Sequence, residues 1–205
     1  MRSGWGEIDG FREDRIKMKD FFQRYSYQSV RLLLNQVAIG IFGFVLALVA
    51  AKMEPEGVRT AALLGVGCFA TLFFLFLQFA STWKGGAEDR VSIDLGKRKK
   101  DALVPLKIWL LANSVSLLLA FLISLGLWFN VEFLGNVGYV AQLIKYIIDG
   151  MYLSLLAVKV GGVPLHDFWF MHFLTTLPAL AVIYASYFCG LNNINFGGLF
   201  SSKNT

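Results

Sequence analysis

Long apolar runs alternate with charged segments along this chain of 205 residues. Four of the runs are span-length, since about 20 residues rising ~1.5 Å each cross the hydrocarbon core of a bilayer as an α-helix. None of the four contains Lys, Arg, Asp or Glu, and none shows the period of two that is typical of a barrel strand. The predicted spans are residues 32–51, 61–80, 108–129 and 168–191.

A fifth apolar stretch, residues 139–158, contains polar residues at helical spacing. Gln142, Lys145, Asp149 and Tyr152 line one stripe of the helix, and apolar residues line the other side. This pattern predicts an amphipathic helix that lies at the membrane interface or packs with its polar stripe inward. A fifth span is the alternative, at a cost of about 2.5–3.5 kcal/mol for each charge in mid-membrane.

Composition supports a membrane protein. Apolar residues make up 56% of the chain and charged residues 16%, whereas soluble domains average about 45–50% and about 25%. An ordinary soluble domain, a disordered chain and a disulfide-stapled module are therefore excluded. The predicted fold is one all-α integral membrane domain, residues 1–205, with a four-helix transmembrane bundle.

The basic residues predict the orientation. Seven Lys and Arg precede the first span and seven lie in the loop after the second, whereas the first loop and the third connection hold two each. The positive-inside rule places the N-terminus in the cytoplasm, and four spans would place the C-terminus there too. Residues 1–31 are predicted to be a cytosolic amphipathic helix on the inner leaflet, or a solvated tail.

The basic loop at residues 82–107 is a candidate docking segment for a cytosolic partner or for lipid headgroups. Its basic charge also serves simply to fix topology, which is the simpler interpretation. Its acidic residues are expected to form exposed ion pairs, which are worth about 0–1 kcal/mol each. The candidate docking residues are Trp83, Glu88, Asp89, Arg90, Asp94, Lys97 and Arg98.

Polar residues of the four spans gather toward the predicted cytoplasmic side. They are expected either to join helices by hydrogen bonds or to line a small polar cavity for a solute or a headgroup. Because polarity mostly stops halfway across the bilayer, a continuous pathway is less favoured. The candidate residues of this cluster are Asn35, Gln36, Gln78, Asn113, Ser186 and Tyr187.

The sequence gives little indication of catalysis or metal binding. His166, Asp167 and His172 are weak metal candidates, because a separation of six residues puts the two histidines about 240° apart on one helix. Neither a phosphate loop nor a catalytic serine–histidine or zinc pattern is present. We expect no enzymatic activity, no cofactor and no nucleic-acid partner.

The stretch after the second span carries a family resemblance. Trp83, Gly86, Ala87, Asp89, Asp94 and Gly96, followed by Asn113, are the residues concerned. With them the chain resembles uncharacterised four-helix integral membrane proteins of Gram-positive bacteria. The resemblance implies a bacterial inner-membrane location and no particular activity.

From the residues we expect a non-enzymatic, membrane-embedded binding or accessory subunit that engages lipids and a protein partner or a second copy of itself. The alternative is a small oligomeric transporter or channel.

Overall fold

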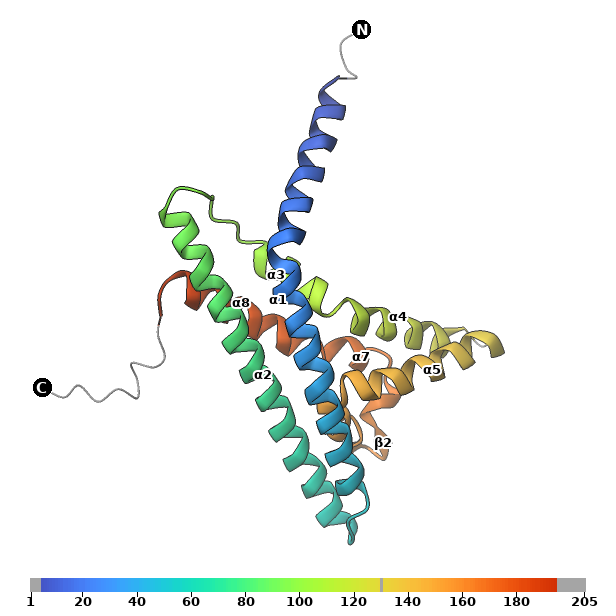
Figure 1. Cartoon of the computed structure of the whole chain (residues 1–205). Coiled ribbons are helices and arrows are strands. Elements are labelled where there is room, and N and C mark those ends of the chain that lie inside the picture. The colour runs from blue at the N-terminus through green and yellow to red at the C-terminus, as the bar shows by residue number, and fades with distance from the viewer. Residues whose placement is uncertain (1–4, 130, 195–205) are drawn as a thin grey trace, which may run out of the picture.

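The computed structural model describes the backbone of residues 5–129 and 131–194, and side chains from residue 21 onward within these ranges. The described chain is almost entirely helical (Figure 1). Three helical segments are long and apolar enough to cross a membrane, and a bent pair of shorter helices makes a fourth if it counts as one span. The prediction of an all-α chain with span-length apolar helices is confirmed.

The elements follow one another as α1 (Trp5–Ala51), α2 (Glu56–Asp94), α3 (Val104–Ala112), α4 (Ser114–Trp128), α5 (Glu132–Ile148), η1 (Gly150–Tyr152), α6 (Leu153–Leu156), β1 (Lys159–Val160), β2 (Val163–Pro164), η2 (Leu165–Asp167), α7 (Met171–Leu174) and α8 (Leu177–Leu191). Helices α1 and α2 lie side by side as a long pair, and α8 crosses α2 (Figure 1). Helices α4 and α5 form a hairpin that projects to one side.

Helices α1 and α2 both extend beyond the predicted spans. The predicted cytosolic helix and the first span form one helix without a break from Trp5 to Ala51. Helix α2 continues to Asp94, so the expected loop at residues 82–107 begins as helix. Its buried positions keep a spacing of three or four residues up to Asp89, and the end of α2 therefore packs against other helices instead of extending into solvent.

The third predicted span is broken at Asn113, where α3 and α4 meet at a bend of 61°. The Asn113 side-chain amide donates to the Trp109 carbonyl at 3.1 Å, and the Ser114 hydroxyl donates to the Leu111 carbonyl at 2.9 Å. Side chains that bond to their own backbone compete with the helical ladder and bend it.

The fourth predicted span also has a break. Thr175 and Thr176 separate α7 from α8, and their hydroxyls donate to the carbonyls of His172 and Phe173. The predicted helix at residues 139–158 starts earlier, at Glu132, and its regular part ends at Ile148. After η1 and α6, β1 and β2 form a short hairpin, and Gly161 and Gly162 supply the positive φ angles of its turn.

Glycines set the closest helix approaches. A Cβ on Gly86 of α2 would lie 2.2 Å from the carbonyl oxygen of Tyr187 on α8, and one on Gly190 of α8 would lie 2.2 Å from that of Trp83. Similarly, a Cβ on Gly40 of α1 would lie 2.1 Å from the carbonyl oxygen of Ile148. These two crossings place backbone against backbone, as close helix packing in membranes does.

Large apolar side chains remain exposed along the long helices. Only 28% of the most apolar stretch of α1, and 22% of that of α2, is buried inside the chain. Soluble monomers rarely expose apolar surface on this scale. The exposed apolar helices are therefore compatible with a membrane location.

The crossing at Gly86 generates a prediction. We expect Gly86→Ala to destabilise the fold by about 1–3 kcal/mol, because the added methyl group meets a backbone oxygen that has little room to retreat. Gly65→Ala, on the same helix with open space around it, is the matched control and is expected to be neutral or slightly stabilising. Thermal unfolding in detergent measures the stability of both variants. Equal melting temperatures for Gly86→Ala and Gly65→Ala would contradict the close approach of α2 and α8 at Gly86.

Candidate functional site

A buried carboxylate organises the end of the bundle where α2 terminates. Asp89 is 2% exposed. The Arg24 guanidinium donates to its Oδ1 at 2.5 Å, and the hydroxyls of Tyr25 and Tyr187 donate to its Oδ2, the latter at 2.7 Å. Arg98 donates to the Tyr25 hydroxyl at 2.9 Å and lies 3.8 Å from Asp89 Oδ1.

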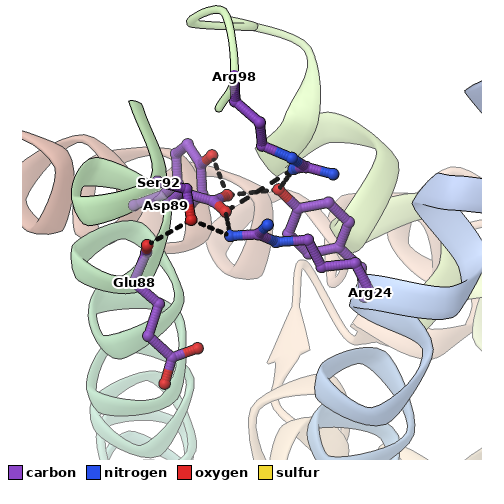
Figure 2. A network of polar contacts seen from close by, with 7 residues as sticks. Arg24, Glu88, Asp89, Ser92 and Arg98 are labelled. Atoms are coloured by element: carbon purple, nitrogen blue, oxygen red, sulfur yellow. Dashed lines mark hydrogen bonds and ion pairs between the residues drawn. The ribbon is translucent and has the colours of Figure 1, made fainter. Parts of the chain in front are cut away.

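We call this group, completed by Ser92, the Asp89 cluster; it carries two guanidiniums and one carboxylate. Figure 2 shows the guanidiniums of Arg24 and Arg98 both reaching toward Asp89, while the carboxylate of Glu88 points away. Ser92 accepts a hydrogen bond from Arg24 at 2.9 Å and donates to the carbonyl of Glu88. The carboxylate is therefore saturated with donors and leaves a net positive charge around it.

The glycine crossing places these groups. Asp89 lies three residues after Gly86 on α2, and Tyr187 lies three residues before Gly190 on α8, so both are about one turn from the point of closest approach. At that separation the Tyr187 hydroxyl reaches the carboxylate across the helix pair.

A cavity of about 270 Å³ lies on one side of the cluster. We call it the Lys99 cavity. Its polar wall holds three cationic and two acidic side chains beside the tyrosines, and its apolar wall includes Phe21, Ile93 and Val104. The full lining is Phe21, Tyr25, Asp89, Ile93, Arg98, Lys99, Asp101, Val104, Lys107 and Tyr187.

The second acid of the Lys99 cavity is also engaged. Asp101 accepts hydrogen bonds from the Leu103 backbone N–H at 2.8 Å and from Lys107 Nζ at 3.1 Å. The bond from Leu103, and after it Lys107, lower the pKa of Asp101 against an opposing effect of partial burial. The carboxylate therefore stays ionised at neutral pH and holds Lys107, which also lies 5.7 Å from the Phe21 ring centre.

A second cavity of about 130 Å³ lies on the other side, between α1 and α2. We call it the Lys84 cavity. It shares Tyr25 and Asp89 with the first cavity as a common wall, and its cations are Arg24, Arg31 and Lys84. The remaining lining residues are Tyr27, Gln28, Ser81, Gly85 and Glu88.

A second buried carboxylate lies in the interior of the bundle. Asp149, 5% exposed, ends α5, where the helix dipole disfavours an anion. Gln36 of α1 donates to its Oδ1 at 2.5 Å, and Ser116 of α4 and Lys145 of α5 donate to its Oδ2. Lys145, 2% exposed, also donates to the Ser116 hydroxyl at 2.6 Å. These four residues form the Asp149 cluster.

Several buried polar atoms of the interior have no hydrogen-bond partner. Among the described residues they include Gln36 Oε1, the Tyr152 hydroxyl and His172 Nδ1, and both amide atoms of Gln78. Tyr152 and His172 lie within electrostatic reach of Asp149. Unpaired buried polar groups are uncommon in folded proteins and call for a specific explanation.

The structure divides the predicted polar cluster of the spans. Tyr187 belongs to the Asp89 cluster and Gln36 to the Asp149 cluster, while Asn35 is only half-buried on α1. Asn113 and Ser186 are buried but bond to carbonyls of their own helices, and Gln78 is buried without a partner. The six residues therefore do not line one common cavity.

The predicted docking residues also separate. The expectation of an exposed ion pair was wrong for Asp89, because α2 continues and turns this residue into the bundle. An exposed pair does form between Arg90 and Asp94 at 3.4 Å. Trp83 donates to the Ile194 carbonyl at 3.1 Å, and Arg98 joins the Asp89 cluster. Glu88 and Lys97 are exposed.

The weak metal candidates do not converge. His166 Nε2 lies 3.4 Å from Asp167, and His172 Nε2 lies 3.1 Å from the His166 carbonyl oxygen. Within residues 5–129 and 131–194, no group of three or more His, Cys, Asp or Glu side chains is arranged to hold a metal ion.

Sequence reasoning missed Arg24, Tyr25 and Ser116 as site residues. Lys145 and Asp149 belong to the predicted polar stripe, and of its two predicted placements the inward one is observed for them. The missed signal for the Asp89 cluster is periodicity, because Thr82, Gly86 and Asp89 continue the buried face of the second span.

No protein-family model matches the chain, and no curated protein or solved structure matches it.

The Asp149 cluster generates a prediction. We expect Asp149→Asn to destabilise the fold by about 3–5 kcal/mol, because it leaves the buried Lys145 ammonium without its counter-charge. The double variant Lys145→Met with Asp149→Leu removes both charges, and its free energy of unfolding is expected to fall by less than that of the single variant. Unfolding in mixed micelles compares the two, and a double variant at least as unstable as the single one would show that charge compensation is not the reason.

Proposed function

We propose that this chain is a multi-pass protein of the bacterial cell membrane that binds anionic phospholipid headgroups, as a non-enzymatic binding or accessory subunit. The observation that carries this proposal is the Lys99 cavity, where Arg98, Lys99 and Lys107 line the same cavity as Asp89, whose carboxylate is already saturated with donors. The positive-inside rule supports a cytoplasmic location for this cavity.

The chemistry of the cavity supports a phosphate group. Both of its acids are engaged by donors, so its cations outnumber the charges that the chain itself supplies. Basic pockets between membrane helices on the cytoplasmic side are a recognised type of lipid-headgroup site. The apolar wall of Phe21, Ile93 and Val104 suits the glycerol and the first acyl carbons of a lipid.

A protein partner or a second copy of the chain has a separate surface available. Glu88 and Lys97 are exposed near the end of α2, and Arg90 and Asp94 pair with each other at the surface. These side chains form a mixed-charge surface outside the Lys99 cavity, which supports a docking role for the accessory subunit.

A small transporter is the second candidate, and the Asp149 cluster is the observation that favours it. A buried ammonium and carboxylate inside a membrane bundle are costly and mark pathways in many transporters. Ion flux into proteoliposomes that is abolished by Asp149→Asn, in protein that remains folded, would favour this candidate over a purely structural pair.

Lipid binding tests the main proposal. We expect the purified chain to retain phosphatidylglycerol over phosphatidylcholine in native mass spectrometry, and the affinity to fall with salt. Lys99→Gln together with Lys107→Gln is expected to weaken phosphatidylglycerol binding roughly 10- to 30-fold, since each basic residue near the headgroups contributes about 1 kcal/mol.

Lys52→Gln together with Lys159→Gln is the matched control, because these exposed lysines line neither cavity. If both double variants lost the same affinity for phosphatidylglycerol, the effect would come from the net charge of the chain and not from the cavity. Competition by free inorganic phosphate at concentrations comparable to the lipid would identify a soluble anion, and not a lipid, as the ligand. No preference for the anionic lipid would overturn the proposal.

A further inference from the structure

The two cavities beside the Asp89 cluster are neighbours with the same chemistry. Tyr25 and Asp89 line both of them, so the partition between the cavities is formed by these two side chains. Each cavity presents three cations: Arg98, Lys99 and Lys107 on one side, and Arg24, Arg31 and Lys84 on the other.

The carboxylate in the partition does not repel an anion as strongly as a free one would. Asp89 receives hydrogen bonds from Arg24, Tyr25 and Tyr187, and Arg98 lies at ion-pair distance. Asp89 together with Arg24 and Arg98 therefore forms a group with one net positive charge. An anion in either cavity faces guanidinium and phenol groups that the same carboxylate holds in place.

The Lys84 cavity has an additional donor without an acceptor. Gln28 Nε2 is buried and has no hydrogen-bond partner, and the Gln28 side chain packs over Gly85, where a Cβ would lie 2.5 Å from Nε2. Gln28 lies between Arg24 and Arg31 at spacings of four and three residues, so the three share one face of α1. This face offers charge and a neutral N–H to one phosphate group.

Given the proposed function, on which this inference rests, we infer that the two cavities together bind a lipid with two phosphate groups. A diphosphatidylglycerol-type lipid places one phosphate in the Lys99 cavity and the other in the Lys84 cavity, with its glycerol bridge across Tyr25 and Asp89. Once the first phosphate is bound, the second binds from a high local concentration, which raises the affinity without any new type of contact.

The test compares diphosphatidylglycerol with phosphatidylglycerol at equal phosphate concentration, using native mass spectrometry of the full chain. We expect diphosphatidylglycerol to bind the wild type about tenfold or more tightly. Arg31→Gln together with Lys84→Gln is expected to bring the ratio of the two affinities close to one. Lys52→Gln together with Lys159→Gln should preserve the wild-type ratio.

The outcomes separate this inference from the proposed function. Binding of phosphatidylglycerol without any preference for diphosphatidylglycerol overturns the two-phosphate inference and leaves the headgroup site intact. A preference that survives Arg31→Gln with Lys84→Gln also overturns it, because the second phosphate would then lie elsewhere. Binding of neither lipid above phosphatidylcholine contradicts the proposed function itself.

Discussion

The structure depends on compensation of buried negative charge. A carboxylate removed from water is costly unless hydrogen-bond donors surround it, and the described side chains include two such groups, Asp89 and Asp149. Each draws its donors from several helices, so neither carboxylate is satisfied unless those helices are packed together. Helix α1 supplies donors to both carboxylates: Arg24 and Tyr25 bond to Asp89, and Gln36 bonds to Asp149. This helix therefore connects the two clusters.

Close backbone packing makes this compensation possible, and it also leaves cationic side chains without an acidic partner. The crossings at Gly86 and Gly40 bring tyrosine and amide donors within reach of the carboxylates. At the end of α2 more cations gather than the carboxylates require, and the surplus lines the two cavities. The same arrangement that stabilises the fold therefore creates the site that we propose for anionic lipid.

The apolar pattern predicted the helices well, because a span-length helix is visible in the sequence as one continuous run of apolar residues. It could not place Asp89, because the charged residues after the second apolar run indicate the end of a span, although the three-and-four spacing of buried positions continues through Gly86 to Asp89. The bend at Asn113 depends on a side chain bonding to its own backbone, which hydropathy does not record. The pairing of Asp149 with Gln36 joins residues 113 positions apart, and without an alignment no pattern in one sequence indicates it.

The most direct measurement is a double-mutant cycle on unfolding in detergent, with Asp89→Asn, Tyr187→Phe and the two combined. If the carboxylate holds α2 to α8 through the Tyr187 hydroxyl, we expect a coupling energy of about 1.5–3 kcal/mol, as for hydrogen bonds to charged groups. If the losses of unfolding free energy in the two single variants sum to that of the double variant within about 0.5 kcal/mol, the account is contradicted, since independent sites are additive to that degree.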